Sequence, residues 1–136
     1  MDRKQRGFTL IEVLIVMVIL GLLASLVGPR MFGKVGASKQ KAAQAQISLI
    51  GTALDTYRLD IGKYPATDQG LEALRVQPHD VTKWDGPYLP KDVPLDPWGN
   101  PYQYRSPGEY GDYDLFSMGA DGALGGEGED EDIVSW

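Results

Sequence analysis

A stretch near the C-terminus holds the densest set of possible metal ligands in the sequence. Residues 121–132 contain six carboxylates among four glycines. Calcium takes about 6–8 oxygen ligands, which carboxylates and main-chain carbonyls of a flexible loop supply. The spacing is not that of an EF-hand loop, and like charges this dense repel one another unless a cation lies between them. From composition alone, a solvated acidic loop is favoured over a calcium site.

Other kinds of chemistry have little support. The chain has no cysteine and a single histidine, His79, which excludes thiol catalysis and leaves too few ligands for a zinc site. Asp112 and Asp114 are a conceivable catalytic pair, but they flank Tyr113 in a predicted strand and have no nucleophile or base nearby. We therefore expect that the protein is not an enzyme.

A single carboxylate, Glu12, interrupts the most apolar part of the chain. It is the only ionisable side chain from Phe8 to Gly28. As a helix, this run spans the ~30 Å hydrocarbon core of a bilayer. It exceeds the ~7–15 apolar residues of a secretory signal and no A-x-A-like site follows, so a retained transmembrane helix is favoured over a cleaved signal. A carboxylate inside a membrane costs free energy. A cationic partner from a second copy of the chain is therefore favoured over an unpaired Glu12 side chain that reaches the membrane–water interface.

Charge divides the chain into two parts. Residues 1–41 carry seven Lys and Arg against two acidic residues, a net charge of +5. Residues 42–136 carry six against seventeen, a net charge of −11. The acidic outer part argues against nucleic-acid binding, which favours a basic surface. Basic residues lie on both sides of the apolar run, so the positive-inside rule does not decide its orientation.

A second helical pattern follows the apolar run. Gly28 and Pro29 are expected to kink the helix or to leave it locally unwound. Apolar residues at steps of three and four then predict an amphipathic helix over residues 30–61, which Gly62 ends. The stripe consists of Ala43, Ile47, Ile50, Leu54, Tyr57 and Ile61. Packing of this stripe onto a small sheet is favoured over a coiled coil.

The next residues predict a short helix and a long irregular loop. Residues 67–74 are expected to be helical, with Thr67 or Asp68 as the N-cap. Residues 76–101 are rich in proline and glycine, which favours turns. Five apolar side chains are expected to hold this loop against the core: Tyr88, Leu89, Val93, Leu95 and Trp98.

The C-terminal part predicts strands. Residues 102–105 and 113–117 alternate in polarity and favour an antiparallel hairpin. A third strand is expected from residues 88–95 or from residues 133–136. The predicted fold class is therefore α+β, with a long N-terminal helix packed on a small antiparallel sheet.

The N-terminal residues resemble a known processing signal. Residues 4–12, Lys-Gln-Arg-Gly-Phe-Thr-Leu-Ile-Glu, together with the apolar run, resemble the class III signal of type IV pilin-like proteins. The resemblance implies that a prepilin peptidase cleaves between Gly7 and Phe8 and that the new amino group of Phe8 is methylated. It also implies that Glu12 pairs with this amine in a neighbouring subunit.

Four further segments resemble the major pseudopilins of the type II secretion system: residues 62–65, 70–74, 96–102 and 119–122. The resemblance implies a structural subunit that polymerises through its N-terminal helix into a pseudopilus and helps to export folded proteins across the outer membrane. The implied partners are further copies of the chain, minor pseudopilins, the prepilin peptidase and the inner-membrane secretion platform. A type IV pilin for adhesion or DNA uptake is the alternative, which the lack of cysteine and the acidic loop disfavour.

The same resemblance implies a domain plan and a location. Residues 1–7 would be a leader peptide in the cytoplasm. Residues 8–28 would be a transmembrane and assembly helix in the bacterial inner membrane. Residues 29–136 would form a pseudopilin domain in the periplasm.

The resemblance also reverses the preference for a merely solvated loop and implies a calcium site. The implied ligands are the side chains of Asp121, Asp130 and Asp132 and the main-chain oxygens of Met118 and Ala123. Glu129 and Glu131 are alternatives to Asp130. The ion would stabilise this loop as a disulfide does in many type IV pilins.

Overall fold

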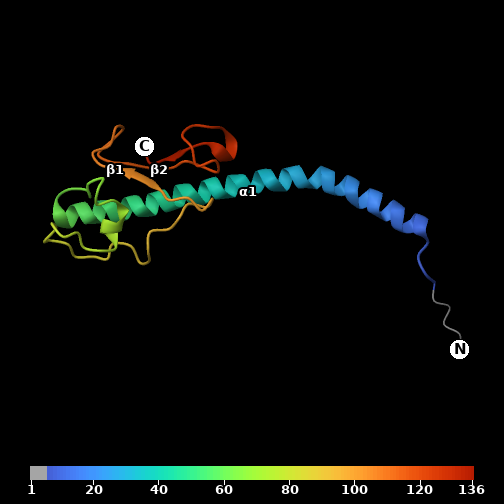
Figure 1. Cartoon of the computed structure of the whole chain (residues 1–136), viewed down its shortest axis with the longest axis horizontal. Helices are drawn as coiled ribbons and strands as arrows, with labels where there is room; N and C mark the ends of the chain where they lie inside the picture. Colours follow the sequence, from blue (N-terminus) through green and yellow to red (C-terminus); the bar gives the residue numbers. More distant parts are fainter. Residues whose placement is uncertain (1–5) are drawn as a thin grey trace, which may run out of the picture. The chain divides into compact units, whose positions relative to one another are not determined.

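The computed structural model describes residues 6–136, apart from the side chains of residues 29–32. The predicted leader therefore lies outside the described residues except for its last two positions. The chain divides into two compact units, one that ends at Val35 and one that comprises Gly36–Trp136. Figure 1 shows the elements along the chain, from helix α1 to the strands near the C-terminus.

Helix α1, Leu10–Ile61, is the long N-terminal helix that the sequence predicts. Its helical assignment continues through Pro29, so of the two expected alternatives, a kink or a locally unwound turn, the unwound turn is not found. A proline removes one backbone donor, and the hydrogen bonds of the neighbouring turns can still hold the helical conformation. The helix ends at Ile61, and Gly62 follows with a φ of 95°, a left-handed conformation that glycine adopts without a steric penalty.

The first unit leaves the apolar side chains of α1 uncovered. The most apolar 18-residue window of the helix has a mean hydropathy of 2.9 and is 0% buried. By length and composition, this helix could cross a membrane. An apolar surface that surrounds a helix on all sides requires a cover of lipid or of other chains.

In the second unit, one face of α1 is buried, as the sequence predicts. Ile47, Ile50, Leu54 and Tyr57 are at most 3% exposed and form the centre of the core. The exposed residue Leu59, by contrast, points away from this stripe and is 84% exposed. Side chains from later in the chain complete the core: Leu71, Leu74, Leu89, Tyr102 and Leu115. The apolar stripe of α1 is therefore buried by side chains of the same unit.

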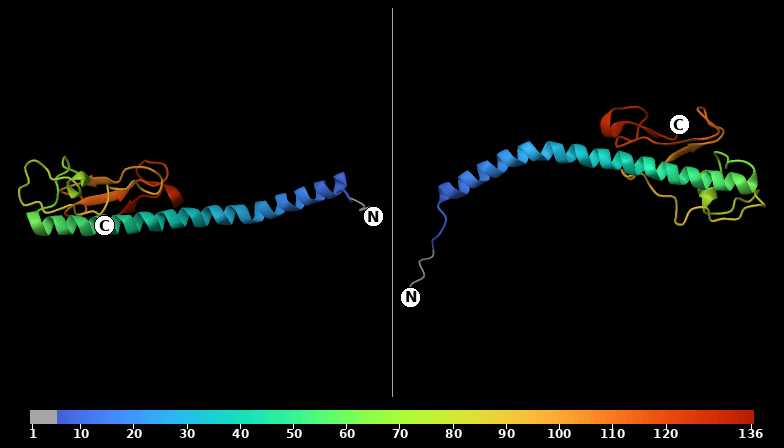
Figure 2. Two further views of the ribbon diagram at one scale, coloured as in Figure 1. Left: turned by 90° about the horizontal axis from the view of Figure 1, so that it is seen from below. Right: turned by 180° about the vertical axis from the view of Figure 1, so that it is seen from behind.

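The sheet has three antiparallel strands in the order β1-β2-β3. Strands β1, Gln103–Arg105, and β2, Asp114–Ser117, form the predicted hairpin. The third strand is β3, Ile133–Val134, so the C-terminal alternative is correct and residues 88–95 form no strand. The sheet lies along the C-terminal part of α1 in all three views of Figures 1 and 2.

The predicted helix over residues 67–74 is only partly correct. The structure has a single 3₁₀ turn, η1, Leu71–Leu74, which follows Gly70 and has no side-chain cap. Thr67 does not cap it, because its hydroxyl donates to the Ser106 carbonyl at 3.1 Å and accepts from the Ser106 N–H at 2.9 Å. The Thr67 hydroxyl thus bonds to a residue 39 positions away along the chain and not to the N-terminus of a helix.

The long loop over residues 76–101 is irregular, as predicted. Leu89 is 4% exposed, and Tyr88 and Val93 pack against the core. The prediction for Leu95 was wrong, because this side chain is 56% exposed. The loop is thus held to the core by only some of the expected side chains.

A buried carboxylate, Asp114, organises the hairpin connection. Its side chain is fully buried and accepts from the Arg105 Nε at 2.7 Å and from the Glu109 and Tyr110 N–H groups at 2.8 and 3.1 Å. Burial raises the pKa of Asp114, but the hydrogen bonds from Glu109 and Arg105 outweigh this effect and lower the pKa below its ordinary value. The ionised carboxylate therefore stabilises the folded hairpin.

We expect this carboxylate to make the second unit sensitive to acid. Because the folded pKa lies below the ordinary value of 3.8, the stabilisation is complete above that pH and is lost as the pH falls through the folded pKa. Asp114→Asn should be less stable than the wild type at neutral pH, and its deficit should shrink below about pH 4. Denaturant titrations of the full chain in detergent micelles measure this difference.

The matched control is Asp112→Asn, because the Asp112 side chain is 73% exposed and pairs with Arg58 at the surface. This variant should keep the wild-type dependence of stability on pH. An Asp114→Asn deficit that stayed constant down to acidic pH would contradict the assignment.

Candidate assembly segment and cation loop

The predicted cleavage site precedes the first helical residue. Gly7 and Phe8 are exposed and non-helical, and the Phe8 side chain is 87% exposed. The peptide bond between them therefore lies outside α1, in backbone without regular secondary structure. A protease requires accessible, non-helical backbone at the bond that it cleaves. In a helix, the backbone hydrogen bonds would keep this bond out of the active site.

Glu12 and Thr9 form a reciprocal cap at the start of α1. The Glu12 N–H donates to the Thr9 Oγ1 at 3.2 Å, and the Thr9 N–H donates to the Glu12 Oε2 at 3.3 Å. These two bonds satisfy donors that a helix N-terminus otherwise leaves unpaired, and the carboxylate also interacts favourably with the helix dipole. Glu12 therefore has a role within its own chain, in addition to the pairing in trans that the sequence predicts.

This cap was missed in the sequence, although its signal is present there. A Thr followed three residues later by a Glu, just before an apolar run, is the pattern of a capping box.

Loop residues 118–132, here called the cation loop, are closed by hydrogen bonds from backbone N–H groups to a carbonyl and to carboxylates. The Ala120 N–H donates to the Glu129 carbonyl at 2.8 Å, and the Gly125 N–H donates to the Asp132 Oδ2 at 3.1 Å. The Asp121 Oδ1 accepts from the Ala123 N–H at 3.1 Å. The two ends of the loop, which carry the predicted ligands, are thus held side by side.

The predicted carboxylates differ in their surroundings. Within residues 6–136, no three His, Cys, Asp or Glu side chains are close enough to hold a metal ion by themselves. The Asp132 Oδ1 is buried and has no hydrogen-bond partner in the part of the chain that the structure describes. The Glu129 side chain lies against Gly36 of α1, where an added Cβ would collide with it. A site at this loop would therefore require main-chain oxygens beside the carboxylates.

A buried polar network adjoins the loop and was not predicted. Asp96 is 4% exposed, and its Oδ1 accepts from the N–H groups of Trp98 and Asn100 at 3.1 and 2.8 Å. Its Oδ2 accepts from the Ser117 hydroxyl at 2.7 Å, and the Ser117 Oγ accepts from the Gly119 N–H at 3.2 Å. The network joins the turn at residues 96–100 to the start of the cation loop.

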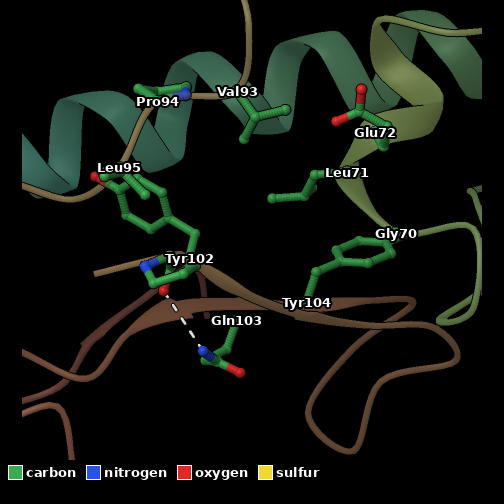
Figure 3. Close-up of a pocket in the computed structure, with 10 residues that line it drawn as sticks. Gly70, Leu71, Glu72, Val93, Pro94, Leu95, Tyr102, Gln103 and Tyr104 are labelled. Carbon is green, nitrogen blue, oxygen red and sulfur yellow. Dashed lines mark hydrogen bonds between the residues drawn. The ribbon is translucent and has the colours of Figure 1, made fainter. Parts of the chain in front are cut away.

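A groove of about 420 Å³ lies between strand β1 and the loops above it (Figure 3). Tyr102 and Tyr104 line it, and burial raises the pKa of both side chains above the ordinary value of 10.0. Glu72 is the only carboxylate among the lining residues, and they include no His, Lys, Arg, Ser or Thr. The groove therefore lacks a paired acid and base or a nucleophile.

The conceivable catalytic pair is also separated in the structure. Asp112 pairs with Arg58 at 3.4 Å, whereas Asp114 is buried beside Arg105. The two carboxylates have different partners and do not share a site.

A long N-terminal helix with exposed apolar side chains, followed later in the chain by a small three-stranded antiparallel sheet, is typical of pilin-like proteins. Two family models cover the chain: "Prokaryotic N-terminal methylation motif" matches residues 2–28, and "Type II secretion system (T2SS), protein G" matches residues 30–136. The chain belongs to the type II secretion system protein G family. It is thus a pseudopilin, a structural subunit of the type II secretion pseudopilus, and a type IV pilin is not favoured.

Relatives and a solved structure agree with this membership. The chain is 48% identical to a type II secretion system core protein G of Pseudomonas aeruginosa, over 98% of this chain and 96% of that protein. It is 50% identical to the same protein of Vibrio cholerae, over 98% and 93%. The crystal structure of the major pseudopilin of enterohaemorrhagic Escherichia coli matches with a TM-score of 0.65 and 37% identity, over 76% of this chain and 87% of that one.

We predict that the cation loop requires glycine at position 119. Gly119 has a φ of 73°, and a Cβ there would lie 2.8 Å from the Glu129 carbonyl oxygen. Gly119→Ala should therefore lower the melting temperature for two reasons. The left-handed backbone would cost alanine about 1–2 kcal/mol, and the added Cβ would collide with the backbone of the loop.

Gly125→Ala is the matched control for this prediction. Gly125 has a φ of 81°, but an added Cβ would meet nothing within 4 Å. Gly125→Ala should thus lower the melting temperature less than Gly119→Ala does. Equal losses in the two variants would show that the close contact at Gly119 has no effect.

Proposed function

We propose that this pseudopilin polymerises through the N-terminal part of α1 into a periplasmic filament that helps to export folded proteins across the outer membrane. The observation that carries the proposal is the match of residues 2–28 to the methylation motif, together with an apolar helix that the chain itself leaves uncovered. Packing of many such helices would remove this apolar surface from water and lipid. Minor pseudopilins and an inner-membrane platform would be the further partners.

Processing would precede assembly. A prepilin peptidase would cleave between Gly7 and Phe8, and the Phe8 amine would then be methylated. The exposed, non-helical backbone at this position supports the proposal. The basic leader would lie in the cytoplasm and the acidic second unit in the periplasm.

Intact mass spectrometry tests the processing step. The full chain, extracted from membranes after co-expression with a prepilin peptidase, should lose residues 1–7 and gain one methyl group. The chain expressed without the peptidase serves as the control and should keep its full mass. The same uncut mass in both samples would contradict the proposed pathway.

Glu12 would then act twice. Its cap with Thr9 stabilises the start of α1. The same carboxylate would also accept a hydrogen bond from the charged Phe8 amine of a neighbouring subunit. Ionised oxygens have several lone pairs, so both bonds are compatible. In an apolar environment, removal of one charge from such a pair would cost about 3–5 kcal/mol.

Substitutions of Glu12 separate the two roles. A glutamine can replace glutamate in a capping box, whereas alanine cannot. Glu12→Gln should keep the cap and membrane insertion but reduce filament formation at least about tenfold, because the charge is lost. Glu12→Ala should lose both the cap and assembly. Crosslinking between copies in membranes measures assembly, and normal crosslinking of Glu12→Gln would contradict a role for the charge.

Calcium would stabilise the cation loop. The oxygen-only donors and the buried, unpartnered Asp132 Oδ1 fit this ion, which accepts main-chain carbonyls as well as carboxylates. Asp121, Asp130 and Asp132 would supply charge, and the carbonyls of Met118 and Ala123 would complete the shell. When bound, the ion would neutralise the repulsion among these carboxylates and hold the loop closed.

Removal of calcium tests this part of the proposal. A chelator should lower the melting temperature of the full chain in detergent micelles, since a ligand at a hundred times its Kd contributes about 2.7 kcal/mol to folding. Asp121→Ala should show no response to the chelator. Asp92→Ala, which removes a 99% exposed carboxylate outside the loop, should respond like the wild type. An unchanged wild-type melting temperature would exclude the calcium site.

A further inference from the structure

The peptide group between Met118 and Gly119 is held by a hydrogen bond from its N–H. In a trans peptide, the carbonyl oxygen and the N–H of the next residue point in opposite directions because the group is planar. The Gly119 N–H donates to the Ser117 Oγ at 3.2 Å. This hydrogen bond therefore fixes the direction of the Met118 carbonyl.

The Ser117 hydroxyl is itself fixed by a second buried group. Ser117 is 0% exposed, and its hydroxyl donates to the Asp96 Oδ2 at 2.7 Å. The other oxygen of Asp96 accepts from the N–H groups of Trp98 and Asn100. None of the ion pairs found among residues 6–136 involves Asp96, so the orientation of this carboxylate depends on hydrogen bonds alone.

We propose that Asp96 and Ser117 are positioning residues for the proposed calcium site, because they hold the Met118 carbonyl in place before an ion binds. The inference rests on the proposed calcium site and deepens it. Neither residue touches the ion. They reduce the reorganisation that binding requires, as partners of the ligands do in metal sites generally.

The hydroxyl of Ser117 provides the sharpest test. Ser117→Ala removes the acceptor for the Gly119 N–H and leaves the volume of the site almost unchanged. Ser117→Thr keeps the hydroxyl and should restore binding. Asp96→Asn places an amide where the Ser117 hydroxyl needs an acceptor. Isothermal titration of CaCl₂ into the full chain, in detergent micelles and freed of calcium, measures the affinity of each variant.

We expect Ser117→Ala and Asp96→Asn to bind calcium about 10–100-fold more weakly than the wild type and Ser117→Thr to bind with nearly wild-type affinity. Asp114→Asn is the matched control, since it alters a buried polar side chain of the same strand that has no hydrogen bond to residues 118–132. It should lower stability without changing the calcium affinity. This contrast separates positioning from a general loss of stability.

The outcomes are distinguishable. Wild-type calcium affinity in Ser117→Ala would overturn the inference and leave the calcium site in place. Equal weakening in Ser117→Ala and Asp114→Asn would also overturn it, because a general loss of stability would then explain both. A wild-type chain that binds no calcium would overturn the proposed site and the inference with it. The comparison of Ser117→Ala with Asp114→Asn decides the matter even where Ser117→Thr does not fold.

Discussion

The structure depends on a helix whose two parts require different surroundings. From Leu10 to Val27, the apolar side chains of α1 surround the helix and are exposed. In the second unit, by contrast, a stripe of apolar side chains on one face of α1 is buried: Ala43, Ile47, Ile50, Leu54 and Tyr57. Only the second of these parts is stable in water, because an apolar surface on all sides of a helix has to be covered by lipid or by other chains. Membership of a filament-forming family agrees with this division.

Buried polar side chains hold the turns and loops of the second unit in place beside its apolar core. Its strands contain only three, four and two residues, so few backbone groups find partners in the sheet. Asp96, Asp114 and Ser117 are buried and take backbone donors from turns and loops instead. A buried carboxylate that accepts several N–H groups can organise a loop that has no periodic structure of its own.

This arrangement connects the core to the proposed functional loop without a disulfide. The Asp96 network reaches the cation loop through Ser117, and the Ala120 N–H joins the loop to residues near its far end. Glycines with positive φ, such as Gly119, allow the backbones to approach closely. A bound cation would add to a loop that is already closed, which limits the conformational entropy that binding has to overcome.

The sequence by itself determined the features that depend on local pattern: the apolar run, the buried stripe of α1, the hairpin and the end of the helix at Gly62. It also contained the Thr9–Glu12 cap, which its spacing indicates. Tertiary structure alone decided that β3 comes from Ile133–Val134, that Thr67 bonds to Ser106, and that Asp96 meets Ser117 across 21 residues. Such contacts join segments that are distant along the chain, so no periodicity or neighbouring residue type encodes them, and only the packing of the whole unit brings their atoms together.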